Sequence, residues 1–94
     1  MLADELALGP ETVVYDLGSG FGRATTLFAM HSGGRSVGVE LDASRHNAAT
    51  RLRQHGLANG LLTPDEAERI VLFHGDAFAP GVFADATHVY MLST

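Results

Sequence analysis

The sequence predicts an α/β fold in which helices cover the faces of an open parallel sheet, and three observations lead to it. Short apolar segments alternate with segments of helical spacing, as in successive βαβ units. A glycine-rich turn, residues 18–22, follows the first apolar segment. Acidic residues follow the apolar segments, at the strand ends where open α/β sheets bind ligands.

The composition limits the size and the class of the protein. A chain of 94 residues forms at most one small domain, residues 1–94. The formal net charge of −5 argues against direct nucleic-acid binding, which needs clustered Lys and Arg. The sequence has no cysteine for a disulfide or a thiolate metal site, no apolar run long enough to span a membrane and no basic start of a signal peptide. We therefore expect an intracellular protein of the nucleus or the cytoplasm.

The N-terminal part of the chain contains a strand between two predicted helices. Residues 1–8 have helical spacing, and Gly9-Pro10 ends that helix. Residues 13–15 are β-branched and aromatic without alternation, which predicts a strand buried on both faces. Residues 21–31 predict an amphipathic helix that residues 33–34, both glycine, can close. Its stripe consists of Ala24, Leu27, Phe28 and His31.

A second strand and a second long helix follow. Residues 36–40 predict the strand, and residues 41–55 predict the helix. Asp42 or Ser44 suits the N-cap, and Gly56 is placed to end the helix. The predicted buried face consists of Ala48, Ala49 and Leu52.

The remaining chain predicts a short helix and two more strands. Thr63 suits an N-cap, Pro64 suits the first turn, and Glu66 lies three residues after the cap, as in a capping box. Residues 70–73 predict the third strand and residues 88–92 the fourth. The order βαβαβ followed by β indicates a parallel sheet.

The glycine-rich turn differs from the dinucleotide-binding motif. Gly18, Gly20 and Gly22 form G-x-G-x-G, and Arg23 occupies the place of the last glycine of G-x-G-x-x-G. Glycine is required where the backbone adopts unusual angles or where a ligand touches the main chain. Turn geometry alone is one interpretation of the motif, and ligand binding is the other.

Three acids support the ligand-binding interpretation. Asp16 ends the first predicted strand, Glu40 ends the second, and Asp76 follows the third. Glu40 comes 20 residues after Gly20, where an acid in such folds accepts hydrogen bonds from ribose hydroxyls. Each acid alone is typical of a solvated turn, but together they predict a binding edge.

Asp16 indicates the charge of the ligand. A carboxylate beside the turn would repel a pyrophosphate by about 1 kcal/mol at a surface-like dielectric, and it would favour a cation. A ligand with adenosine at one end and an ammonium and a sulfonium at the other fits this pattern. S-adenosylmethionine has this charge distribution, and the helix N-terminus after Gly22 suits its carboxylate.

The segments DLGSGFG, VGVEL and HGDAF resemble the cofactor-binding half of a class I, seven-stranded S-adenosylmethionine-dependent methyltransferase. The resemblance covers residues 13–94. The pattern D-L-G-S-G-x-G, followed by G-V-E and G-D, is similar to that of the non-SET histone lysine methyltransferases of the telomeric-silencing-disruptor family. DLGSGFGR is also similar to mitochondrial lysine methyltransferases that act on an ATP synthase subunit. The resemblance implies a Rossmann-like sheet of order 3-2-1-4, truncated after the fourth strand, and a protein lysine as methyl acceptor.

The resemblance assigns one set of residues to the methionine end of the cofactor. It implies that Asp16 faces the ammonium group, directly or through water. The backbone at Gly18, Ser19 and Gly20 would pack along the methionine part, and Gly22 would let the helix start close by.

A second set is assigned to the adenosine end. The resemblance implies that Glu40 binds both ribose hydroxyls and that Leu41 lies against the adenine. Asp76 would accept a hydrogen bond from the adenine amino group, and Ala77 or Phe78 would add backbone or face contacts.

The acceptor end carries no assignable catalytic residue. In the histone enzymes an Asn-containing segment ends the fourth strand, whereas Ser93 falls near that position here. The 94 residues alone are therefore expected to lack activity, and either to self-associate or to be completed by further chain. The histidines lack metal-ligand spacing, so no metal site is expected.

Two other functions stay open at this point. The chain could be an NAD(P)-binding domain of an oxidoreductase, with Glu40 on the cofactor ribose; Arg23 and the charge of Asp16 speak against it. It could instead be a non-catalytic relative that keeps the fold as a scaffold.

Overall fold

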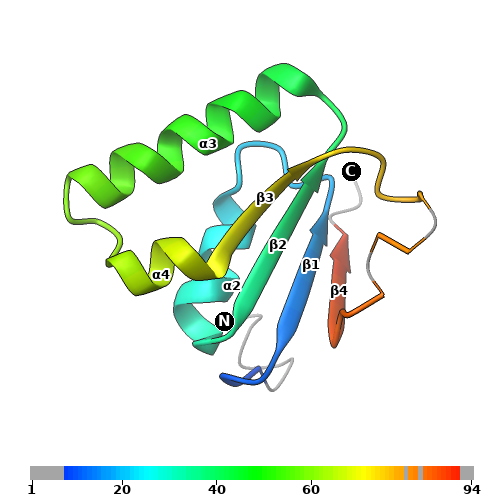
Figure 1. The fold of residues 1–94 in the computed structure, drawn as a ribbon, viewed down its shortest axis with the longest axis horizontal. Helices are drawn as coiled ribbons and strands as arrows, with labels where there is room; N and C mark the ends of the chain where they lie inside the picture. The colour runs from blue at the N-terminus through cyan, green and yellow to red at the C-terminus, as the bar shows by residue number, and fades with distance from the viewer. Residues whose placement is uncertain (1–7, 80, 83, 92–94) are drawn as a thin grey trace.

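A computed structural model describes residues 8–79, 81–82 and 84–91. They form a sheet with helices packed on it (Figure 1). The helix expected over residues 1–8 lies outside the described residues except for Leu8, and so do Leu92 and Ser93. The strands are β1 (Val13–Leu17), β2 (Arg35–Glu40), β3 (Ile70–His74) and β4 (His88–Met91), and the helices are α2 (Arg23–Ser32), α3 (Ala43–Ala58) and α4 (Pro64–Arg69).

The four strands form one parallel sheet in the order β3-β2-β1-β4. This confirms the predicted Rossmann-like topology, and the strands appear in this order from left to right in Figure 1. Asp16 of β1 lies in register with Gly38 of β2 on one side and Tyr90 of β4 on the other. The end of β1 is therefore enclosed by two neighbouring strands.

The two faces of the sheet are covered differently. Val14 packs on Phe28 of α2, whereas the neighbouring residue Tyr15 packs with Val82 and Ala86 of the connection between β3 and β4. Alternate residues of a strand point to opposite faces, so α2 and this connection lie on opposite sides. Helices were expected on both faces, but no helix is found among the described residues that link β3 to β4.

Hydrogen bonds attach the connection to the sheet. The Tyr15 hydroxyl donates to Asp85 over 2.6 Å, and Arg35 forms an ion pair with the same carboxylate. Thr87 bonds both main-chain groups of Val13. Burial raises the pKa of Tyr15, whereas its hydrogen bond lowers the pKa of Asp85. These bonds fix the end of the connection that leads into β4.

Helix α2 buries a different face from the predicted one. Leu27 is 45% exposed, while two small polar residues, Thr25 and Ser32, are buried. Their hydroxyls are satisfied inside the protein: Thr25 donates to Asp16, and Ser32 accepts from Gly34. Because these side chains are short and internally paired, α2 approaches the sheet closely on that side. The observed buried residues are Thr25, Phe28, Ala29 and Ser32.

The N-terminus of α3 agrees with the prediction, but its C-terminus does not. Asp42 is the N-cap and accepts a hydrogen bond from the Arg45 amide over 2.9 Å. The helix runs past Gly56, which is buried inside it, and Asn59 is the C-cap. A Cβ at Gly56 would lie 3.2 Å from Leu62. The glycine therefore provides space for a neighbour and does not end the helix.

The capping box of α4 is confirmed. The Glu66 amide donates to the Thr63 hydroxyl over 3.1 Å, and the Thr63 amide donates to the Glu66 carboxylate over 2.9 Å. Arg69 then joins α4 to the end of α2 by donating to the carbonyls of Ala29 and Gly34. In the described part of the chain, no helix has the length and apolar character to cross a membrane.

Candidate ligand-binding site

The glycine-rich turn adopts a backbone that only glycine enters readily. Gly18, Gly20 and Gly22 have φ angles of 73°, 58° and 82°, in the left-handed region that disfavours other L-residues. A Cβ at Gly18 or Gly20 would meet no protein atom within 4 Å. Backbone conformation, rather than crowding by the protein, accounts for these two glycines.

The N–H groups of the turn are used inside the protein. Gly18 and Ser19 donate to the Val39 carbonyl over 2.8 and 3.1 Å, and the Gly20 amide donates to Glu40 Oε1 over 2.6 Å. The Gly22 amide donates to the Ser19 carbonyl. These four amides point back into the protein, so the turn is not an array of free donors for a phosphate.

Glu40 holds the turn against α3. Its side chain is buried, and its two oxygens accept from the amides of Gly20 and Asp42, at 2.6 and 3.0 Å. Arg45 lies 3.7 Å from Oε2. Each carboxylate oxygen can accept more than one hydrogen bond, so Glu40 can hold the turn and still receive a ligand hydroxyl.

Asp16 is a buried carboxylate at the start of the turn. It is only 3% exposed, and its Oδ2 accepts the Thr25 hydroxyl over 2.8 Å. Burial raises the pKa of Asp16; hydrogen bonds from Thr25 oppose this, and the charge of Glu40 adds to it. A nearby cation would stabilise the ionised form.

Two hollows adjoin the turn, on either side of Gly18. The first, called here the Asp16 hollow, has a volume of about 280 Å³. The second, the Asp76 hollow, has a volume of about 290 Å³. The Asp16 hollow is lined by Asp16, Gly18, Ser19, Phe21, Arg23, Ala24, Leu27 and Tyr90. The Asp76 hollow is lined by Leu17, Gly18, Val39, Glu40, Leu41, Gly75, Asp76, Ala77, Phe78 and Met91.

The structure brings the predicted residues together around these hollows. Gly20 and Gly22 are absent from both linings, but they shape the turn between the hollows. Tyr90 and Met91 of β4 were not predicted as site residues. Their place at the end of a parallel strand, beside Asp16 and Leu17 in register, is the signal that could have found them.

Exposed apolar side chains line part of the Asp76 hollow, and a histidine contacts the backbone of one of them. Leu41 is 70% exposed and Phe78 is 74% exposed. A ring nitrogen of His74 lies 3.1 Å from the Leu41 carbonyl, and Asp76 accepts from the Phe78 amide over 2.9 Å. The His46 ring stacks on His74. Apolar surface beside a carboxylate suits a flat, polar-edged ring.

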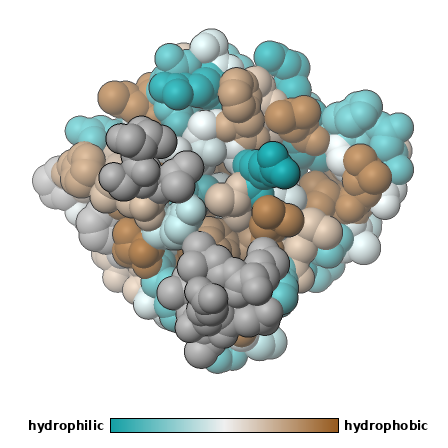
Figure 2. Space-filling model, turned by 180° about the vertical axis from the view of Figure 1, so that it is seen from behind, coloured by the Kyte–Doolittle hydropathy of each residue, from teal (hydrophilic) through white to brown (hydrophobic). Residues whose placement is uncertain are grey.

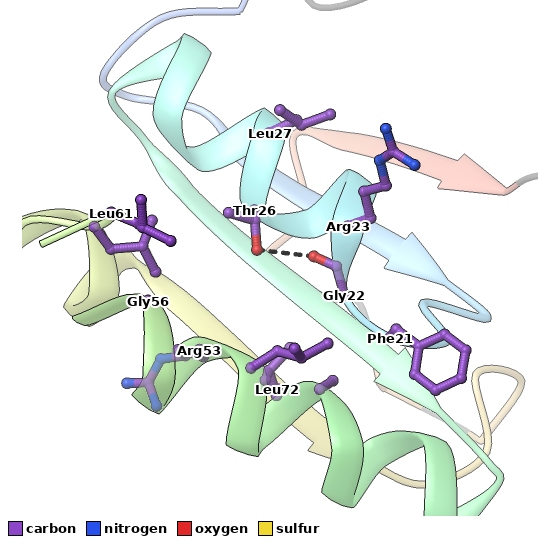
Figure 3. Close-up of a pocket in the computed structure, with 12 residues that line it drawn as sticks. Phe21, Gly22, Arg23, Thr26, Leu27, Arg53, Gly56, Leu61 and Leu72 are labelled. Carbon is purple, nitrogen blue, oxygen red and sulfur yellow. Dashed lines mark hydrogen bonds between the residues drawn. The ribbon is translucent and has the colours of Figure 1, made fainter. Parts of the chain in front are cut away.

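A larger cavity, of about 370 Å³, lies elsewhere. It runs between α2 and α3, with Leu61 at one end and Phe21 at the other (Figure 3). Its polar groups are already paired in part: Thr26 donates to the Gly22 carbonyl over 2.8 Å, and Arg53 donates to the Ala67 carbonyl. The lining of this groove is mostly apolar and includes no carboxylate, whereas Asp16, Glu40 and Asp76 line the two hollows, which are therefore the better site for a cationic, hydroxyl-bearing ligand.

Comparison with known proteins identifies the fold. No protein-family model matches the sequence, and no curated protein matches it significantly. Solved structures do match. An RNA methyltransferase from Salinibacter ruber, in complex with S-adenosyl-L-homocysteine, has a TM-score of 0.75 and 28% identity over 99% of this chain and 57% of its own. The chain has the fold of S-adenosylmethionine-dependent methyltransferases.

Two further structures of this kind are similar over shorter parts. An S-adenosylmethionine-dependent methyltransferase from Geobacter sulfurreducens, with S-adenosyl-L-homocysteine, has a TM-score of 0.62 and 33% identity over 81% of this chain and 27% of its own. The glycopeptide N-methyltransferase MtfA, with S-adenosylmethionine, has a TM-score of 0.62 and 28% identity over 80% of this chain and 31% of its own. The chain thus spans between 27% and 57% of these three structures.

Proposed function

We propose that this chain is the cofactor-binding part of an S-adenosylmethionine-dependent methyltransferase. The observation that carries the proposal is the buried Asp16 carboxylate, which lines one of two hollows on either side of the glycine turn. A buried carboxylate favours a cationic ligand. The similar structures that hold S-adenosylmethionine or S-adenosyl-L-homocysteine support the same cofactor.

In this proposal the methionine end occupies the Asp16 hollow. Asp16 receives the ammonium group, and the turn at Gly18, Ser19 and Gly20 lies along the methionine chain. The amides of these turn residues donate inside the protein, so the cofactor contacts their Cα atoms and carbonyls. Gly22 is the N-cap of α2, and the first turn of that helix suits the carboxylate of the cofactor.

The adenosine end occupies the Asp76 hollow. Glu40 accepts hydrogen bonds from the ribose hydroxyls with lone pairs that Gly20 and Asp42 leave available. Leu41 lies against the adenine, Asp76 accepts from its amino group, and Ala77 contacts it through the backbone. Bound S-adenosylmethionine supplies an electrophilic methyl group, while these residues align it.

Binding of a dinucleotide is disfavoured by the same geometry. A pyrophosphate needs free N–H donors, whereas four amides of the turn are already bonded within the protein. Asp16 would add repulsion. The glycine turn beside the Asp16 carboxylate therefore suits the cationic sulfonium region of S-adenosylmethionine better than a diphosphate.

We propose a protein lysine as the acceptor, on the resemblance of the DLGSGFGR segment to lysine methyltransferases alone. Similar structures include an RNA methyltransferase and a glycopeptide N-methyltransferase. A methylation assay on a full-length protein that contains this chain, offered protein, RNA and glycopeptide acceptors, tests the assignment. Methylation of RNA or glycopeptide, without protein, would overturn it.

Calorimetry tests the cofactor. We expect the chain to bind S-adenosylmethionine and S-adenosyl-L-homocysteine, and to bind NAD much more weakly. Tight NAD binding would favour an oxidoreductase domain. Failure to bind any of the three would favour a non-catalytic scaffold.

A further inference from the structure

One threonine joins helix α2 to the buried acid of the site. Thr25 has no solvent exposure, and its hydroxyl donates to Asp16 Oδ2 over 2.8 Å. Its main-chain N–H also stabilises the charged form of Asp16. The Thr25 hydroxyl therefore holds this carboxylate.

Asp16 lies against the first turn of α2, which has no side-chain cap. Gly22, the N-cap, has no side chain, and the first turn of the helix contains no acid. A cap side chain normally accepts from the amide of the second or third helical residue. Thr25 is the third residue of α2, and its hydroxyl donates to Asp16, so the strand residue contacts the first turn from outside the helix.

Gly38 leaves the space in which the Thr25 hydroxyl lies. A Cβ at Gly38 would lie 2.7 Å from Thr25 Oγ1 and 2.9 Å from Ser19 Oγ. Gly38 is buried in β2, in register with Asp16. Glycine inside a strand is unfavourable unless another group approaches closely. Here the approaching groups are the threonine that holds Asp16 and a serine of the glycine turn.

We propose that Thr25 is a positioning residue: its hydroxyl, in the space left by Gly38, fixes the Asp16 carboxylate that receives the cofactor ammonium. The inference depends on S-adenosylmethionine being the ligand. Thr25 is fully buried and does not touch the ligand itself. Its effect is therefore specific to the charged end of the cofactor and leaves the adenosine end unchanged.

The expected signature follows from the charges around Asp16. The Thr25 bonds lower the pKa of Asp16, whereas burial and the Glu40 charge raise it. Arg23 lines the same hollow. Without the hydroxyl, protonation of Asp16 begins at a higher pH, so binding of the ammonium group weakens at a higher pH than in the wild type.

Calorimetry across a pH series, with S-adenosylmethionine and adenosine as ligands, tests the role of Thr25. Thr25→Val is expected to weaken S-adenosylmethionine binding about 10- to 100-fold, as for loss of a hydrogen bond to a charged group, and to leave adenosine binding unchanged. Thr25→Ser should restore affinity and the pH profile. Thr26→Val is the matched control, because this hydroxyl bonds the Gly22 carbonyl and not Asp16.

The outcomes separate the two proposals. Wild-type protein that fails to bind S-adenosylmethionine overturns the proposed function. If the wild type binds S-adenosylmethionine, three results overturn only the role of Thr25. These are an unchanged affinity in Thr25→Val, an equal loss of adenosine affinity in that variant, and a Thr25→Ser variant that binds as weakly as Thr25→Val. If Thr25→Val does not fold by circular dichroism, Thr25→Ala carries the test, since it removes the same hydroxyl without adding bulk beside Ser19. Selective loss of S-adenosylmethionine affinity supports the inference, and retained affinity overturns it.

Discussion

At the scale of single residues, Glu40 serves both the fold and the proposed cofactor. Its carboxylate accepts from the amides of Gly20 and Asp42, and it is only 5% exposed. Removing it leaves two amides without their acceptor, each a penalty of about 1–3 kcal/mol if no water replaces it. Stability and ligand binding are therefore coupled at this position.

We expect Glu40→Ala to weaken S-adenosylmethionine binding by roughly 2–4 kcal/mol and to lower the free energy of unfolding as well. Glu40→Gln should lie between the alanine variant and the wild type, because it keeps one acceptor oxygen. Calorimetry and urea unfolding measure the two effects. Glu68→Ala, on the exposed surface of α4, is the control. Unchanged affinity in Glu40→Ala would remove the acid from the site.

Asp16 predicts an unusual dependence of stability on pH. Its pKa is raised in the folded protein from the ordinary value of 3.8, so the folded state binds this proton more tightly than the unfolded state. The stabilisation is complete below pH 3.8 and is lost as the pH rises through the folded pKa. Asp16→Asn is neutral throughout and keeps an oxygen that can accept from the Thr25 hydroxyl, so its stability relative to the wild type should increase with pH.

Urea unfolding from about pH 2.5 to pH 8 measures this trend, and the lower part of the range covers a control whose pKa is lowered from 3.8. Asp42→Asn provides the opposite case, because hydrogen bonds from Ser44 and the Arg45 amide lower the pKa of Asp42. Its relative stability should decrease as the pH rises. A parallel decrease in Asp16→Asn would contradict the buried-charge argument.

The positions of single residues could be predicted where chain geometry alone determines them. Acids at the ends of parallel strands converge on one edge, so Asp16, Glu40 and Asp76 could be grouped from the sequence. The bond between Thr25 and Asp16 could not, because threonine was placed outside the predicted apolar stripe. Periodicity of apolar residues does not detect a buried polar pair.

At the scale of elements, the glycine turn permits a matched test of backbone and ligand effects. Gly20 has φ +58° and Gly60, after α3, has φ +74°, and a Cβ at either would meet nothing within 4 Å. Alanine at each position costs about 1–2 kcal/mol of backbone strain. Only Gly20 belongs to the turn between the two hollows.

We expect Gly20→Ala and Gly60→Ala to lower the free energy of unfolding by similar amounts, and only Gly20→Ala to weaken S-adenosylmethionine binding. Urea unfolding and calorimetry on the two variants check this. Equal affinities would show that Gly20 is needed for turn geometry alone. In that case the functional interpretation of the turn would lose its support.

Element positions were predicted best where local chemistry determines them. The capping box at Thr63 and Glu66 and the N-cap at Asp42 are local hydrogen-bonding patterns, and both occur as predicted. The predicted end of α3 at Gly56 was wrong, because this glycine leaves room for the Leu62 side chain inside a longer helix. This is an effect of tertiary packing. A glycine in a sequence does not reveal whether it ends a helix or makes room for a neighbour.

At the scale of the whole molecule, the described residues leave considerable apolar surface exposed. Seen from behind the view of Figure 1, apolar surface lies in several separate areas among hydrophilic ones (Figure 2). At the sheet, Val71 and Phe73 of β3 and Val89 and Met91 of β4 are 39–55% exposed. In the described part of the chain, β3 and β4 each pair with one strand only.

The parallel topology of the sheet could be predicted from the βαβ order. The connection between β3 and β4, which has no helix among its described residues, could not, since its sequence has no periodic pattern.

We expect a polypeptide of these 94 residues to self-associate through the β4 edge and to lack methyl transfer. An exposed apolar edge strand offers unpaired main-chain groups to another sheet, and apolar surface there adds to the attraction. Val89→Lys should reduce association, because a charged side chain on an edge strand opposes pairing. Leu57→Lys replaces an exposed apolar residue of α3 and is the matched control. Sedimentation at low and high concentration measures the effect, and a monomer at both concentrations, or one that turns over S-adenosylmethionine, would contradict the prediction.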